Sequence, residues 1–147
     1  MVVVNVIAAC LSSTVMAQTT VVGWGNNGQG QTDVPPGLTD VTAIAAGWDF
    51  SMVLKSDGTV VAWGDNTYGQ TDVPDDLTGV TAIASAGNFS LALKSDSTVV
   101  AWGDNEYGQT DAPAGLKDVV AITKGAYHGL ALKSDGTLVA WGRNYHG

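Results

Sequence analysis

The sequence predicts an all-β fold made of β-propeller blades, each with three to four antiparallel strands, and three observations support this prediction. A Trp-Gly pair recurs at Trp24, Trp63, Trp102 and Trp141, each 39 residues after the one before. Only short β-prone runs lie between these pairs, and turn-forming residues separate them. The chain has 19 glycines among its 147 residues, without a collagen-like triplet period, as expected of many tight turns. Strand-forming repeats of about 40 residues are typical of propeller blades.

The first element in chain order is an apolar, uncharged stretch over residues 1–17. We expect an export leader, because Val15 and Ala17 stand where a small-residue cleavage site before Gln18 requires them. An N-terminal edge strand is the alternative. The segment "IAAC", which ends at Cys10, also resembles a lipoprotein signal and would supply a lipid anchor at the single cysteine of the chain. The sequence therefore predicts a secreted or periplasmic protein, with a cell-surface lipoprotein as the second route.

The repeats follow over residues 18–147, as units 24–62, 63–101 and 102–140 and a partial unit 141–147. Each whole unit contains a run such as "VTAIA", a second run such as "SMVLKS" and a third such as "TVVAWG". These runs have the length and composition of strands, and no apolar pattern of helical period and length occurs.

Turn chemistry separates the strands. In "KSDGT", Lys55 to Thr59, the Asp-Gly pair predicts a hairpin turn in which both central residues take positive φ. Ser97 replaces this glycine in the middle unit, which predicts a strained or differently shaped turn there. The segment "GQTDVP", which begins at Gly30 and at Gly69, predicts a short outer or connecting strand that the proline ends.

One such sheet cannot bury both of its faces, so consecutive units are expected to stack about an axis. The repeated tryptophans offer large flat apolar bodies, and the glycine after each lets a neighbouring backbone approach closely. We expect these tryptophans to pack between blades, because a ligand site has no reason to recur identically in each blade.

The segment "VVAWGDNTYGQTDVP" followed by "VTAIASAGNFSLALKS" resembles the regulator of chromosome condensation repeat family. The resemblance extends from about Thr20 to the end of the chain. Within the family, the repeats look most like the secreted bacterial branch that includes β-lactamase-inhibitory protein II. The resemblance implies a propeller that normally has seven blades and serves as a rigid protein-binding disc.

The number of strands predicts an incomplete ring. The segment "TTVVGWG", Thr19 to Gly25, corresponds to the last strand of a blade, and the last whole unit already has its own. Closed propellers start at about four blades, which exceeds the three units present. We therefore expect part of a seven-bladed propeller. The alternative is a chain that closes by self-association through open blade faces.

Two short windows differ between the units and lie between strands, so they are expected to be loops at the blade ends. Aromatic side chains on loops of a rigid scaffold are typical of protein interfaces. The resemblance places the contact residues of the secreted branch in the first window, although Phe89 has the alternative of packing beneath its loop. In the second window, Tyr68 and Tyr107 have a structural alternative, because both occupy the same offset. The candidate partner-binding residues are Trp48, Asp49, Asn88, Phe89, Tyr127, His128, Tyr68 and Tyr107.

Charge and residue pattern argue against other classes of function. The net charge of −8 repels nucleic acid and anionic lipid. Neither His128 nor His146 accompanies a recurring nucleophile or a metal-spaced partner, so no catalytic site, metal or cofactor is predicted. The repeated aspartates depart from the calcium-loop spacing and are expected to form turns; they are Asp65, Asp72, Asp104 and Asp111.

The sequence thus predicts a non-catalytic, secreted protein-interaction module whose partner could be an extracellular enzyme. A carbohydrate-binding propeller is one alternative, but its pocket would recur in each blade. A structural adhesin module is another. Guanine-nucleotide exchange fits less well, because the constant spacing leaves no room for an inserted wedge.

Overall fold

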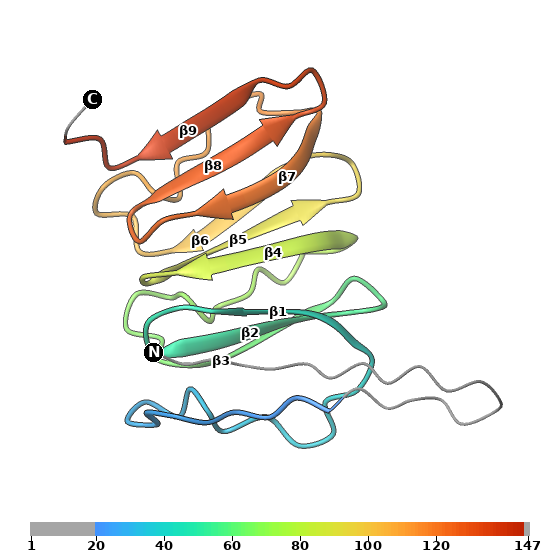
Figure 1. Ribbon diagram of the computed structural model, residues 1–147, viewed down its shortest axis with the longest axis vertical. Coiled ribbons are helices and arrows are strands. Elements are labelled where there is room, and N and C mark those ends of the chain that lie inside the picture. Colours follow the sequence, from blue (N-terminus) through green and yellow to red (C-terminus); the bar gives the residue numbers. More distant parts are fainter. Residues whose placement is uncertain (1–19, 146–147) are drawn as a thin grey trace, which may run out of the picture.

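The computed structural model describes residues 20–145, and these form three antiparallel three-stranded sheets, which we call blades 1 to 3 (Figure 1). The predicted leader over residues 1–17, including Cys10, lies outside the described residues. Within residues 20–145 there is no helix long and apolar enough to cross a membrane. Blade 1 consists of β1 (Val41–Ala46), β2 (Phe50–Lys55) and β3 (Val60–Gly64); blade 2 of β4 (Val80–Ala86), β5 (Phe89–Lys94) and β6 (Val99–Gly103); and blade 3 of β7 (Val119–Lys124), β8 (His128–Lys133) and β9 (Leu138–Gly142).

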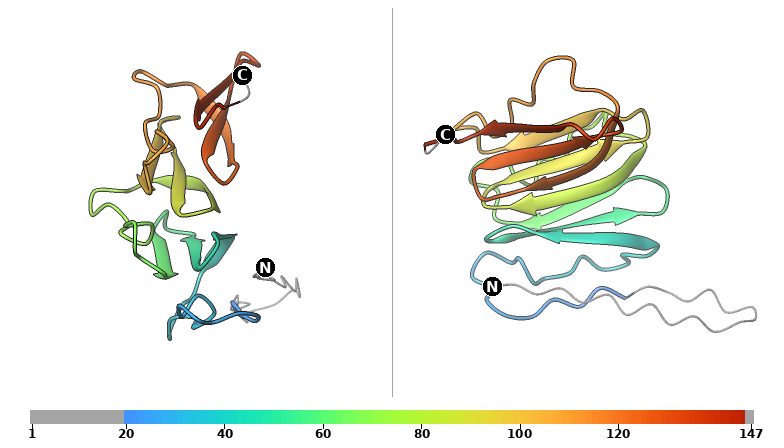
Figure 2. Two further views of the ribbon diagram at one scale, coloured as in Figure 1. Left: turned by 90° about the vertical axis from the view of Figure 1, so that its left-hand side faces the viewer. Right: turned by 45° about the horizontal axis from the view of Figure 1, so that its top comes forward.

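The blades stack in sequence order and fan out, as Figure 2 shows in its left view. The first strands form the inner edge of the fan, where β1 contacts β4 and β4 contacts β7. Each blade is a simple meander in which the second strand lies in the middle. The all-β prediction, with propeller blades of three strands, is confirmed.

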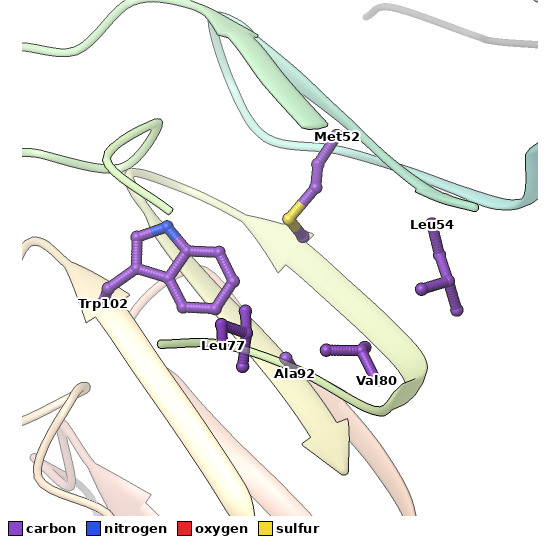
Figure 3. Close-up of a cluster of buried hydrophobic side chains, with 6 residues drawn as sticks. All are labelled: Met52, Leu54, Leu77, Val80, Ala92 and Trp102. Atoms are coloured by element: carbon purple, nitrogen blue, oxygen red, sulfur yellow. The ribbon is translucent and has the colours of Figure 1, made fainter. Parts of the chain in front are cut away.

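Successive side chains of each middle strand point to opposite faces of its sheet, so apolar residues from one strand enter the cores on both sides of the blade. In β2, Met52 and Leu54 face blade 2, whereas Val53 faces the segment that precedes blade 1. Figure 3 shows the core between blades 1 and 2, where these two side chains lie opposite Ala92 and Trp102. Burial of each such large apolar side chain contributes about 1.5–3 kcal/mol. Stacking of blades therefore supplies the apolar burial that one sheet lacks.

Residues 20–40 cover the other side of blade 1, at the bottom of Figure 1. Val21 is buried there against Val41 and Val53, and Val34 and Leu38 pack beside it. The predicted leading strand is reduced, within the described residues, to an isolated bridge at Val22. The segment thus packs as the outer part of a further unit.

Three of the four tryptophans of the Trp-Gly pairs pack between blades, as predicted, whereas Trp24 is 43% exposed. The indole Nε1 of each of these three donates a hydrogen bond to a main-chain carbonyl in the "GQTD" loop that precedes its blade. The three pairs are Trp63 with Gln31 at 3.1 Å, Trp102 with Gln70 at 3.0 Å and Trp141 with Gln109 at 2.9 Å.

The outer strand predicted at the "GQTDVP" segments is not formed, and this prediction is wrong. Within the described residues they form turns, with Asp33 N bonded to Gly30 O at 3.0 Å and Asp72 N bonded to Gly69 O at 3.1 Å. The glutamine after each glycine is buried, and its Oε1 accepts a hydrogen bond from the backbone two residues earlier. This local bond holds the chain in a turn and keeps it from extending along the sheet edge.

The hairpin turns also differ from the prediction. Only Gly58 has a positive φ, of 81°, in the first of them, and Asp57 does not. Gly58 N bonds to Lys55 O, and Lys55 N bonds to Thr59 O, which is a three-residue loop with the glycine in the left-handed position. Asp57 stays in the right-handed region because its carboxylate accepts hydrogen bonds from Thr59 N and Oγ1.

Candidate binding surface

The two variable windows come together at one end of the blades, which we call the loop end. Phe50 pairs with Gly64 across β2 and β3, so the β1–β2 loop and the chain that leaves β3 lie at the same end. The equivalent pairs Phe89 with Gly103 and His128 with Gly142 repeat this arrangement in blades 2 and 3. The loop end is on the left of Figure 1, where β9 ends.

Four aromatic side chains form a chain of edge-to-face contacts at the loop end. Trp48 contacts Tyr127 with ring centroids 5.7 Å apart, and Tyr127 contacts Tyr107 at 5.4 Å. Tyr107 in turn contacts Tyr145 at 6.0 Å. These distances and near-perpendicular planes are favourable for aromatic pairs. We call these four residues, together with Arg143, the aromatic surface.

Arg143 lies among three of the rings. Its guanidinium carbon is 4.0 Å from the ring centroid of Tyr145, 4.9 Å from that of Tyr107 and 5.2 Å from that of Tyr127. Such cation–π contacts fix a long side chain that would otherwise be mobile. The charge of Glu106 raises the pKa of the Tyr107 phenol above its ordinary value. An open pocket of about 330 Å³ lies beside this cluster, lined by Ala126, Tyr127, His128, Arg143 and Tyr145.

Trp48 spans from blade 1 to blade 3. Its backbone N bonds to Gly87 O of blade 2 at 3.0 Å, while its indole reaches Tyr127 of blade 3. The residues equivalent to Trp48 in the next two blades are Gly87 and Ala126, and a Cβ on Gly87 would collide with the carbonyl oxygen of Ala126. Glycine at position 87 therefore lets the loops of blades 2 and 3 approach each other closely. Trp48 and Tyr145 both remain exposed.

Asp49 and Asn88 support the loops. Both are half-buried, and the Asp49 carboxylate accepts a hydrogen bond of 2.9 Å from Gln31 Nε2. The main-chain carbonyls of Asp49 and Asn88 accept bonds from the backbone N of Asp65 and Asp104. These contacts tie the first window to the chain that leaves the third strand and so make the loop end rigid.

Phe89 belongs to the core. It is fully buried in the cluster between blades 2 and 3, where Lys124 lies over its ring. Its assignment as a contact residue is therefore wrong, because blade 3 covers it. His128 occupies the equivalent position in blade 3 and is exposed, with its imidazole over Gly125.

The second window divides in a similar way. Tyr107 joins the aromatic surface, whereas Tyr68 is exposed and takes part in none of the ring contacts found in residues 20–145. The sequence interpretation omitted Arg143 and Tyr145 from the candidates. A comparison of the residues that follow each Trp-Gly pair could have found Arg143, because Asn26, Asp65 and Asp104 stand in its place elsewhere.

The repeated aspartates serve the turns. Asp65 Oδ1 accepts hydrogen bonds from Thr67, whose hydroxyl lowers the pKa of this carboxyl group. Asp72 and Asp111 each accept a side-chain bond from the asparagine six residues earlier. Among the described residues, no group of three or more His, Cys, Asp or Glu side chains is placed to hold a metal ion.

Comparisons with solved structures support the fold. Prp20p from Saccharomyces cerevisiae is 20% identical with a TM-score of 0.73, and the match covers 84% of this chain and 41% of that one. Human WBSCR16 is 23% identical with a TM-score of 0.69, over 83% and 42% of the two chains. The ectodomain of the Physcomitrella patens receptor kinase CR4 is 27% identical with a TM-score of 0.66, over 86% and 36%. The chain therefore spans about two fifths of the length of these proteins.

A search of curated protein sequences gives no significant match. A family model does match, over residues 41–70, 80–109 and 117–147, and it describes the regulator of chromosome condensation (RCC1) repeat. Each matched range begins just before or at the first strand of a blade and ends in the following "GQ" turn or at the end of the chain. The three matches together cover more than half of the sequence, and the chain belongs to the RCC1 repeat family.

Proposed function

We propose that this chain is a non-catalytic, exported protein-binding module that holds its partner on the aromatic surface. One observation carries the proposal. Side chains from loops of all three blades form one connected cluster of four aromatic rings and an arginine at the loop end. These residues come from the positions at which the repeats differ, so the cluster is a feature of the assembled fold and not of the repeat.

The chemistry of the cluster suits a protein partner. Trp, Tyr and Arg are the residue types that most often dominate binding energy at protein interfaces. The loops that carry them are held by backbone hydrogen bonds, such as Trp48 N to Gly87 O and Arg143 N to Tyr127 O. A preorganised surface loses little conformational entropy when it binds. We infer that the partner packs an apolar patch with hydrogen-bond acceptors against these rings.

Two features support the proposal that this protein is exported. Residues 1–17 have the composition of an export leader, and the repeats resemble the secreted bacterial branch of the family that includes β-lactamase-inhibitory protein II. The partner would then be another exported protein, such as an extracellular enzyme. Prp20p has binding properties to Gsp1p and histones, which supports protein binding as a use of this fold.

The first test captures partners from the extracellular fraction of the source cells with three immobilised forms of the chain. The forms are the wild type, the double variant Trp48→Ala/Tyr127→Asp and the single variant Tyr68→Ala. We expect proteins that the wild type and Tyr68→Ala retain to be lost with the double variant. A purified partner should then bind the double variant at least about 30-fold more weakly, because two hot-spot residues are removed.

Aspartate is chosen at position 127 so that loss of binding can be separated from loss of folding. Gln109 Nε2 is buried without a hydrogen-bond partner, whereas the equivalent Gln31 bonds to Asp49, the counterpart of Tyr127. Tyr127→Asp should therefore satisfy Gln109 and keep the loop in place, which thermal unfolding will show. Equal binding by a folded double variant, or binding to a glycan array with no protein retained, would contradict the proposal.

A further inference from the structure

Arg143 is an exposed cation at the loop end, in a chain that has 6 basic residues against 14 acidic ones. The ion pairs found in residues 20–145 join a lysine to the aspartate two residues later in each hairpin turn; they are Lys55 with Asp57, Lys94 with Asp96 and Lys133 with Asp135. Lys124 lies over the Phe89 ring between two blades. Within the described part of the chain, Arg143 and Lys117 are therefore the exposed cations for which no ion pair is found.

The loop that carries Arg143 does not need this side chain. Asp65 and Asp104 hold its position in blades 1 and 2, and the carboxylate of each accepts a hydrogen bond from the backbone N two residues later. An arginine side chain has no acceptor, so blade 3 gives up this turn contact and reverses the sign of the charge. The backbone N of Arg143 donates to Tyr127 O at 2.9 Å, and this bond holds the loop whatever the side chain.

Three tyrosine rings hold the guanidinium of Arg143 beside a pocket of about 330 Å³ at the loop end. Ala126 lines this pocket, at the position that Trp48 occupies in blade 1. The ring contacts use no hydrogen-bond acceptor, so the planar fork of N–H donors stays available. The rings also displace water from beside the charge, which strengthens its attraction for an opposite charge.

We propose that Arg143 anchors an acidic side chain, Asp or Glu, of the protein partner, which enters the pocket beside Tyr127 and Tyr145. This inference rests on the proposed function and names the chemistry that the aromatic surface selects. The N–H fork of arginine matches a carboxylate, with which it forms two parallel hydrogen bonds. The net charge of −8 disfavours a carboxylate over most of the surface. The partner's acid therefore has one preferred place, which fixes the orientation in which the partner docks.

Glu106 is the carboxylate of this chain that competes with the partner. Its charge raises the pKa of the Tyr107 phenol, and the charge of Arg143 acts on the same phenol in the opposite direction. Both charges thus lie close to one ring, although no ion pair between them is found in residues 20–145. Glu106→Gln should strengthen the binding of an acidic partner by about two- to fivefold, as expected for the loss of one exposed competing charge.

The test selects peptides from a random library displayed on phage, with the full 147-residue chain immobilised. We expect selected peptides to contain Asp or Glu beside an apolar or aromatic residue. Arg143→Gln should weaken a purified peptide of this kind by about 10- to 100-fold, because a charge-assisted contact is lost. Arg143→Glu should bind it still more weakly and should regain affinity for the same peptide with Lys in place of its acid.

Lys117→Gln is the matched control, because it removes the same charge from an exposed lysine just before β7, at the other end of the blades. It should bind as the wild type does. Trp48→Ala separates this inference from the proposed function, because Trp48 belongs to the aromatic surface but is not one of the rings around Arg143.

Peptides that Trp48→Ala weakens, but that Arg143→Gln weakens no more than Lys117→Gln does, would overturn the acidic anchor and leave the proposed function standing. A selection that yields no peptide, or only peptides that neither Trp48→Ala nor Arg143→Gln weakens, would contradict both.

Discussion

At the scale of single residues, the least expected feature is a lysine between two blades. Lys124 ends β7 at the position held by Ala46 and Ser85 in the other blades. Its Nζ donates to the main-chain carbonyl of Phe89 and lies 3.2 Å from the centroid of that ring. Burial lowers the pKa of this amine to about 6. The charged form is therefore unfavourable inside the fold.

Lys124→Met should stabilise the protein at neutral pH, by about 1 to 3 kcal/mol, because it removes a polar group from an apolar site. In the wild type the unfolded chain keeps this proton up to an ordinary pKa of 10.5, whereas the folded chain loses it near 6. The unfolded state binds more protons across that window, so the stability of the wild type should rise with pH there. The benefit of the variant should shrink as the pH rises.

Urea unfolding at several pH values between about 6 and 10 measures both effects. Lys117→Met serves as the control, because Lys117 is exposed. A wild type whose stability has the same pH dependence as Lys124→Met would show that this amine stays charged in the fold.

At the scale of elements, the hairpin turns show how local chemistry and tertiary contact combine. Ser97 has a φ of 63°, in the place where Gly58 and Gly136 have 81° and 84°. The strain predicted from its sequence is confirmed. The carbonyl of Ser97 accepts a hydrogen bond of 3.2 Å from Val119 N, as that of Gly58 does from Val80 N. Each of these two turns thus also links its blade to the next, which holds the serine in its unfavourable conformation.

Ser97→Gly should therefore raise the free energy of unfolding by about 1 kcal/mol, because glycine adopts positive φ without a Cβ penalty. Gly136→Ser is the reciprocal change. A Cβ at Gly136 would meet no atom within 4 Å, so only the backbone conformation opposes it. We expect this variant to lose a similar amount. Chemical denaturation measures the free energy of unfolding of both variants. Equal stability of the wild type and the two variants would show that the conformation of Ser97 is not strained.

At the scale of the whole molecule, the position of a blade in the stack decides how well it is protected. Leu91 in β5 is fully buried, because blade 3 covers it, whereas its counterpart Leu130 in β8 is only half-buried. Blade 2 is the one blade of the described residues with another complete blade on each face. Local opening should therefore cost more in blade 2 than in blade 3.

Hydrogen exchange followed by mass spectrometry should show slower exchange in β5 than in β8, by roughly tenfold or more. The measurement compares peptides from the two middle strands within the same protein, so the solution conditions are identical for both. Uniform exchange across the two blades would mean that the stack unfolds as a single cooperative unit.

The repeat itself shows how much could be predicted without tertiary structure. The strands, their order within a blade, the strained turn at Ser97 and the packing role of Trp102 follow from features within one unit. Alternation and turn chemistry act over a few residues, so a sequence pattern can predict them. The outer strand expected at Gly69 failed because the buried Gln70 closes a turn there, and a periodic pattern cannot show that a polar side chain is buried.

The sequence by itself determined the blades, the register of the repeat and the two windows that vary. Only the tertiary structure decided which variable residues share a surface. Trp48 and Tyr127 lie 79 residues apart in the sequence and meet because the stacked blades bring their loops to one end. Phe89 became core because blade 3 covers it. Contacts between blades depend on how sheets pack across the whole stack, and no pattern within one repeat contains that information.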